Sequence, residues 1–235
     1  MTYAGRVYQD EAIAATLAAL REHQRVIVCM PTGVGKTVTF SRLADLYLRA
    51  GHRVLVLAHR EELLEQGAEK LEAITGVRAA FEQADRREAT LDSQLVIASV
   101  PSLINRIDRF PPDHFKLVIL DEAHHALAPT FLSVLEHFTA KTVGFTATPN
   151  RGDEKALAQV FGAVAFDMTL ADAIGQGWLV PPHVETIECP SLDLAKVRSR
   201  SGELAAGDLG RVLSEIAVLR EAIGPALRRA SDLKA

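Results

Sequence analysis

The sequence predicts an α/β fold in which helices cover both faces of a mostly parallel sheet. Short apolar segments alternate with stretches of helical periodicity, and this alternation is typical of strand–helix–strand units. An acidic pair follows one apolar segment, and a glycine-containing loop follows another. We expect strands at 26–30, 53–57, 95–99, 116–120 and 141–145 and helices at 9–23, 37–49, 61–74, 102–107, 129–138 and 153–160.

The remaining segments are assigned from weaker patterns. The charged stretch 83–91 is predicted to be a loop or a frayed turn. After residue 160 we expect a strand at 164–167, a helix at 170–175, an exit segment at 178–182 and a strand at 183–189. A helix is expected over about 212–230, because Leu213, Ile216, Leu219 and Ile223 recur at helical spacing. The predicted domains are therefore 1–189 and a linker with a helix at 190–235.

A phosphate-binding loop is predicted between the first strand and the second helix. The segment reads Pro31-Thr32-Gly33-Val34-Gly35-Lys36-Thr37. Its glycines let backbone N–H groups face a polyphosphate, Lys36 can reach the β- and γ-phosphates, and the Thr37 hydroxyl can bind Mg²⁺. Met30 stands where the general pattern has its first glycine. The alternative is a glycine-rich turn that carries an exposed lysine.

An acidic motif follows the apolar strand 116–120 and reads Asp121-Glu122-Ala123-His124. An acidic residue at the carboxyl end of such a strand lies where open α/β sheets bind ligands. Asp121 can hold Mg²⁺ there, and Glu122 can orient or deprotonate an attacking water. Taken alone, the tetrapeptide could instead be a helix start with acidic residues in its first turn.

Together with Thr146-Ala147-Thr148, these two motifs resemble superfamily 2 DEAD/DEAH-box helicases, in the type III restriction-subunit and RadD-like branch. The resemblance runs from about residue 6 to residue 182 and implies an N-terminal RecA-like P-loop NTPase domain that uses ATP and Mg²⁺. It assigns adenine recognition to Arg6 and Gln9 and nucleotide binding to Thr32, Gly33, Val34, Gly35, Lys36 and Thr37. It also implies that His124 links the ATP site to neighbouring motifs and that Thr146 and Thr148 couple the γ-phosphate to domain movement.

Four residues are candidates for nucleic-acid contact by the same resemblance: His59, Arg60, Ser99 and Ser102. Each follows a predicted strand and offers donors to phosphate. Arg60 could instead form salt bridges with the glutamates that follow it. The net charge of −4 and the pI of about 6.1 are not typical of a dedicated nucleic-acid coat protein, although they allow a local cationic groove.

Three functions fit these motifs. The first is the motor domain of an ATP-dependent DNA helicase or translocase with a repair or restriction role. The second is an RNA helicase of similar layout, and the form Thr-Ala-Thr-Pro-Asn-Arg at 146–151 favours DNA over RNA. The third is a nucleotide-gated binding module without turnover, which would not need the water-activating carboxylate of Glu122.

Helicases of this family place ATP between two similar domains, and the second supplies an arginine finger. No second run of strands follows residue 189. We therefore expect the chain to end near a domain boundary, or its partner half to be another polypeptide. Because a missing arginine finger costs about 10³–10⁵ in rate, we expect ATP–Mg²⁺ binding with poor hydrolysis and no unwinding by this chain alone.

Composition adds limits on location. No apolar run approaches the roughly 20 residues of a membrane span, so no membrane partner is expected. The two cysteines, Cys29 and Cys189, do not indicate a disulfide framework or a zinc site, and they fit a reducing cytoplasm. The pair His124-His125 could suggest a metal site, but the resemblance gives His124 a role in the ATP site.

Overall fold

The computed structural model describes residues 5–58, 61–147, 154–182, 189–197, 199–200, 203–204, 206–215, 217–221, 223–224 and 227. The chain divides into two compact units, 1–180 and 181–235, which are described separately. The predicted boundary at residue 189 falls inside the second unit, and the two-domain assignment stays a prediction.

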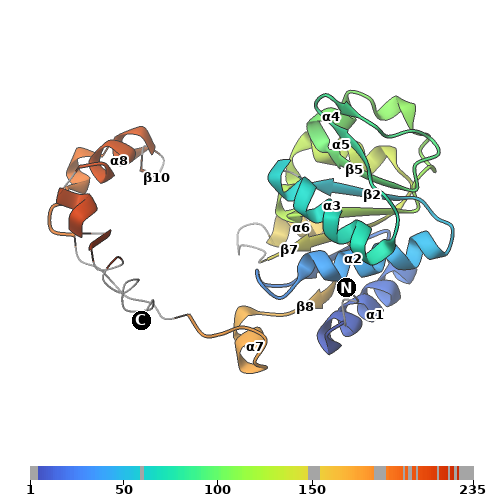
Figure 1. The fold of residues 1–235 in the computed structure, drawn as a ribbon, viewed down its shortest axis with the longest axis horizontal. Helices are drawn as coiled ribbons and strands as arrows, with labels where there is room; N and C mark the ends of the chain where they lie inside the picture. The colour runs from blue at the N-terminus through green and yellow to red at the C-terminus, as the bar shows by residue number, and fades with distance from the viewer. Residues whose placement is uncertain are drawn as a thin grey trace. The chain divides into compact units, whose positions relative to one another are not determined.

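The first unit alternates strands and helices along the chain, as Figure 1 shows. Its strands are β1 (Arg25–Cys29), β2 (Val54–Ala58), β3 (Ala80–Gln83), β4 (Arg86–Arg87), β5 (Leu95–Ser99), β6 (Leu117–Asp121), β7 (Lys141–Thr146) and β8 (Ala163–Asp167). Its α-helices are α1 (Val7–Glu22), α2 (Lys36–Arg49), α3 (Glu61–Thr75), α4 (Val100–Ile104), α5 (Pro129–His137), α6 (Glu154–Val160) and α7 (Leu170–Gly175). Short 3-10 helices are η1 (Ile107–Arg109) and η2 (Ala123–Leu127).

The strands form one eight-stranded sheet in the order β4-β3-β5-β2-β6-β7-β1-β8. Every neighbouring pair is parallel except β3 with β4, which is antiparallel. The predicted mostly parallel sheet is therefore confirmed. Because the strands are parallel, the segments that follow β1, β2, β5, β6 and β7 all emerge at one edge of the sheet.

Side chains that alternate along each strand build two cores, one on each face of the sheet. On one face, residues such as Val28 and Ile119 pack with side chains of α1, α2 and α3. On the other face, residues such as Ile27 and Leu120 pack with side chains of α4, α5 and α6. Strands buried on both faces are typical of parallel sheets, and this explains why the central strands are apolar throughout.

Two predictions in the first unit are wrong in detail. The stretch 83–91 is not only a loop, because the end of β3 and the whole of β4 lie within it as an antiparallel hairpin. The segment is mostly charged or polar, so it lacks the run of apolar residues from which strands are predicted. The helix expected at 102–107 begins earlier, at Val100, and ends at Ile104, and η1 follows it.

The second unit contains η3 (Leu194–Lys196), the short antiparallel pair β9 (Ser199–Arg200) and β10 (Glu203–Leu204), and α8 (Ala206–Leu213). The helix expected over 212–230 is therefore wrong in its start: α8 begins before Val212 and ends at Leu213, and helical backbone resumes at 217–221 after a bend. The expected strand 183–189 lies largely outside the described residues. Among the residues the structure describes, no helix combines the length and apolar composition that crossing a bilayer requires.

Candidate functional site

Three neighbouring strands bring the nucleotide-site candidates to one edge of the sheet. β6, β7 and β1 are adjacent, with the glycine loop after β1, Asp121 as the last residue of β6 and Thr146 as the last residue of β7. The Met30 N–H donates to the Thr146 carbonyl over 2.9 Å, which ties the start of the loop to the end of β7. The loop and the acidic motif, which are 85 residues apart between Lys36 and Asp121, therefore share one site.

The loop has the backbone conformation that its glycines allow. Gly33 has a φ of 92° and Gly35 a φ of 91°, both in the left-handed region, and α2 begins at the next residue, Lys36. A Cβ added to Gly35 would lie 2.9 Å from Nε2 of Gln9, so a side chain here would displace that amide and would also strain the left-handed backbone. Lys36 and Thr37 consequently occupy the first turn of a helix whose N-terminal end can bind an anion. Thr32 is exposed at the turn.

The start of α1 lies against this loop. The Tyr8 hydroxyl donates to the Val34 carbonyl, and Nε2 of Gln9 lies 3.4 Å from the same oxygen. Oε1 of Gln9 accepts the backbone N–H of Arg6 over 3.1 Å, and the Arg6 guanidinium donates to the Tyr8 hydroxyl over 3.1 Å. The structure thus brings the two predicted adenine-contacting residues to the loop, together with Tyr8, which the sequence reasoning missed.

The acidic motif faces the loop lysine. Nζ of Lys36 lies 4.0 Å from one carboxylate oxygen of Glu122, and the other oxygen lies 3.4 Å from Nδ1 of His124. The Lys36 side chain is only 11% exposed. Glu122 has a φ of 54°, which is uncommon for a residue other than glycine, and its backbone N–H donates to Asp121 over 3.1 Å. Such strain often marks functional positions, and here it turns Glu122 toward Lys36.

The pKa of Asp121 is raised, first by burial of its carboxyl group and then by the negative charge of Glu122. The N–H of Glu122 and the charges of Lys36 and His124 oppose this rise. The carboxylates of Asp121 and Glu122 therefore concentrate negative charge at the end of β6, near the start of the helix that carries Thr37. This donor set suits Mg²⁺, which usually takes one or two carboxylates and completes its shell with phosphates and water.

We predict that Asp121→Asn stabilises the nucleotide-free chain at neutral pH. A carboxyl group with a raised pKa favours folding most below its unfolded pKa, near the ordinary value of 3.8, and that contribution is lost as the pH rises through the folded pKa. The amide carries no charge, so the Tm of the variant should exceed that of the wild type at pH 7. The Tm difference should shrink toward pH 4. Calorimetry across this range checks it, and equal Tm values at pH 7 would contradict it.

The end of β7 carries a buried hydroxyl at Thr146, one of the two predicted coupling residues. Thr146 is buried, and its Oγ1 has no hydrogen-bond partner among the described residues. A buried donor without a partner is costly, so it calls for an explanation such as a bound ligand or a second conformation. The other predicted coupling residue, Thr148, lies outside the described residues.

The other half of the same sheet edge holds two of the four nucleic-acid candidates. The Ser99 hydroxyl donates to the Ser102 hydroxyl over 2.9 Å, and Ser102 accepts the backbone N–H of Ala84 over 2.8 Å. Ser99 ends β5, and Ala84 follows β3, its parallel neighbour. The structure thus brings these two serines together beside the β3–β4 turn. His59 and Arg60 lie outside the described residues, so their place in this group stays a prediction.

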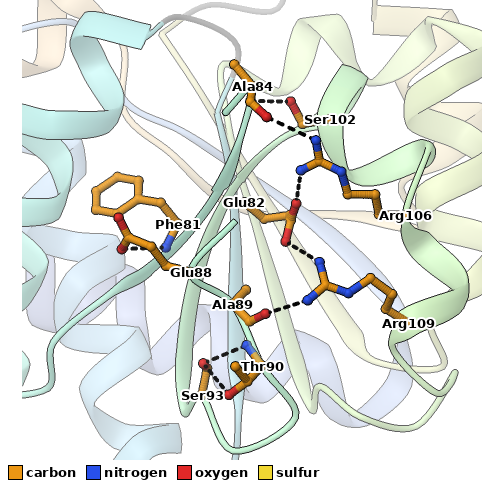
Figure 2. Close-up of polar contacts among 10 residues, drawn as sticks. All are labelled: Phe81, Glu82, Ala84, Glu88, Ala89, Thr90, Ser93, Ser102, Arg106 and Arg109. Atoms are coloured by element: carbon orange, nitrogen blue, oxygen red, sulfur yellow. Dashed lines mark hydrogen bonds and ion pairs between the residues drawn. The ribbon is translucent and has the colours of Figure 1, made fainter. Parts of the chain in front are cut away.

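A buried ionic cluster supports that turn, as Figure 2 shows. The Glu82 carboxylate is fully buried on β3, and it pairs with the guanidinium of Arg106 and, over 3.0 Å, with that of Arg109. Arg106 also donates to the Ala84 carbonyl over 3.0 Å, and Arg109 to the Ala89 carbonyl over 2.9 Å. The sequence reasoning missed this cluster, because Glu82 is separated by 24 and 27 residues from its two arginines.

Comparisons with known proteins identify the family of this chain. The family model described as the type III restriction enzyme, res subunit, matches residues 2–151. The chain belongs to this family. It is 30% identical over 226 residues to the Saccharomyces cerevisiae protein named "Putative ATP-dependent helicase IRC3", covering 89% of this chain and 32% of that protein. It is 27% identical to the type I restriction enzyme EcoAI endonuclease subunit of Escherichia coli, covering 84% of this chain and 26% of that protein.

Solved structures with a similar fold are also known for this res-subunit family member. A fragment of a "putative HsdR subunit of a type I restriction enzyme" from Vibrio vulnificus YJ016 matches with a TM-score of 0.58 and 26% identity, over 73% of this chain and 32% of that chain. The first unit is a RecA-like helicase domain, as predicted. The chain spans about a third of the length of the two curated relatives named as IRC3 helicases.

Proposed function

We propose that this chain is the ATP-binding motor domain of an ATP-dependent DNA helicase or translocase. The observation that carries the proposal is the convergence of the glycine loop and the acidic motif, with Nζ of Lys36 4.0 Å from the Glu122 carboxylate. A lysine at a helix start, two glycines with left-handed backbone and a strand-end carboxylate pair are the parts that a P-loop NTPase needs.

Each group then has one task. The N–H groups of the loop and the Lys36 ammonium bind the β- and γ-phosphates, while Thr37 and Asp121 would hold Mg²⁺. The metal, when bound, neutralises charge on the phosphates. Glu122 accepts a proton from the attacking water, and the contact with His124 orients that carboxylate. Arg6 and Gln9 would select the adenine base.

The proposal includes a second RecA-like domain that completes the site in the full-length protein. The support is the length of the relatives, of which this chain spans about a third. An arginine from that domain would stabilise the transition state, and its absence lowers hydrolysis by about 10³–10⁵ in this class of enzyme. We therefore propose that this chain alone binds ATP but turns it over slowly.

DNA is the proposed nucleic acid, because the matching family is a restriction-enzyme family. Ser99 and Ser102 would contact the phosphate backbone at the half of the sheet edge that does not hold the nucleotide. A role in repair or restriction and a cytoplasmic location belong to the same proposal. Cys29 and Cys189 are cysteines outside any disulfide, which fits a reducing compartment.

Calorimetric titration of this chain with ATP and Mg²⁺ tests the nucleotide site. Lys36→Ala should abolish measurable binding, whereas Lys70→Ala, which removes an exposed lysine on α3, should leave it unchanged. Steady-state turnover by the full-length protein should rise on addition of single-stranded DNA and much less with RNA. Unchanged affinity in Lys36→Ala would overturn the assignment of the site, and stronger stimulation by RNA would favour the RNA helicase instead.

A further inference from the structure

The segment Trp178–Leu179, which follows α7 near the end of the first unit, has no role in the function proposed above. It is anchored at its start, because the backbone N–H groups of Trp178 and Leu179 both donate to the Ala173 carbonyl, over 2.8 and 3.1 Å. Ala173 is itself fully buried. The backbone that carries the indole ring is therefore held at the end of a helix.

The indole of Trp178 packs on the residues that hold the phosphate loop. Its centroid lies 4.9 Å from that of Tyr8 in an edge-on arrangement, and the Arg6 guanidinium carbon lies 5.5 Å from the indole centroid. Tyr8 in turn donates its hydroxyl to the Val34 carbonyl. A continuous line of contacts thus runs from Trp178 through Tyr8 to the loop, and Arg6 lies over the indole while it donates to the Tyr8 hydroxyl.

Leu179 brings the same segment to the loop at a second point. A Cβ on Gly33 would lie 3.2 Å from Cδ2 of Leu179, so the leucine packs closely over that glycine. The next residue, Val180, is 87% exposed, so its substitution can serve as a control for substitutions of Trp178. The segment therefore reaches the loop directly through Leu179 and, by way of Tyr8, through Trp178.

We propose that Trp178 is a positioning residue of the nucleotide site. It holds the flexible side chain of Arg6 by a cation–π contact and fixes Tyr8 by edge-on packing, so that both are preorganised for the nucleoside part of the ligand. The proposal rests on the proposed function, because it assumes that ATP binds at this loop. It predicts that losing the indole weakens binding of the nucleoside while the phosphate cradle stays intact.

A direct test uses the intrinsic fluorescence of this chain, since Trp178 is its only tryptophan. Titration with ATP and Mg²⁺ should change the Trp178 emission in a saturable way, with the Kd that calorimetry gives. Heat of binding without any change in emission would overturn the inference and leave the proposed function standing. No binding by calorimetry would instead count against the proposed function itself.

Substitution tests the positioning role more sharply. Trp178→Ala should weaken ATP binding by about 3- to 10-fold, which is the range of a partly exposed cation–π contact with its packing. Affinity for inorganic tripolyphosphate should not change, and Trp178→Phe should restore most of the ATP affinity. Val180→Ala is the matched control and should behave as the wild type. Equal losses for ATP and tripolyphosphate would mean a merely structural role and would overturn the proposal, as would no loss for either ligand.

Discussion

Glu122→Gln in the full-length protein is expected to lower ATP turnover by roughly 10²–10⁴-fold while leaving ATP binding nearly unchanged. The amide keeps the size of the side chain but cannot accept a proton from the attacking water at neutral pH. The backbone at this position, with its φ of 54°, is equally strained for Glu and Gln, so the substitution isolates the chemistry from the conformation. The substitution removes a negative charge 4.0 Å from Nζ of Lys36. It should therefore not weaken binding of the negatively charged phosphates of ATP.

Steady-state turnover with saturating single-stranded DNA, measured beside calorimetric ATP affinity, checks this expectation. Glu136→Gln is a suitable control, because Glu136 is an exposed carboxylate on α5. It should leave both quantities unchanged. Turnover within a few-fold of wild type in Glu122→Gln would show that another group activates the water, and the role proposed for Glu122 would have to be given to that group.

The nucleotide half of the site could be predicted from sequence because its chemistry depends on short continuous motifs. The segments 26–30 and 117–120 are apolar throughout because both faces of their strands are buried, and a polar motif follows each of them directly. Parallel strands send such motifs to one edge of a sheet, so both motifs were expected at the same edge. The strand order that makes β6, β7 and β1 neighbours, and so brings Glu122 to Lys36, comes from the structure. The structure adds the distance of 4.0 Å between Nζ of Lys36 and the Glu122 carboxylate, and it shows the strained backbone of Glu122.

Contacts between distant side chains could not be predicted in the same way. A half-buried strand is expected to alternate polar with apolar residues, but the segment 83–91 is mostly charged or polar, so its pattern predicts a loop. The partners of Glu82 lie 24 and 27 residues along the chain, and no periodicity connects them. The sequence predicts Trp178 only as part of an exit segment, because nothing in its local sequence indicates contact with Tyr8.

Glu82→Ala is expected to destabilise the folded chain by about 3 kcal/mol. Removing one partner of a buried ion pair leaves uncompensated charge, and losses of about 3–5 kcal/mol are typical when the site is fully buried. The Arg106 side chain is 18% exposed and that of Arg109 is 45% exposed, so solvent can partly rescue the second arginine and the lower end of the range applies. Urea denaturation of this chain, followed by circular dichroism, measures the change in free energy of unfolding.

Two further variants separate the ionic contribution from simple loss of volume. Glu82→Gln keeps the shape and the acceptor oxygen but not the charge, so it should lie between the wild type and Glu82→Ala. Asp85→Ala, at the exposed turn of the same hairpin, should change the stability by less than about 0.5 kcal/mol. If Glu82→Ala were as stable as the wild type, the desolvation of three charged groups would cancel their attraction. The cluster would then serve only to hold Ala84 beside Ser102. In that case Glu82→Ala should lose DNA affinity without losing stability.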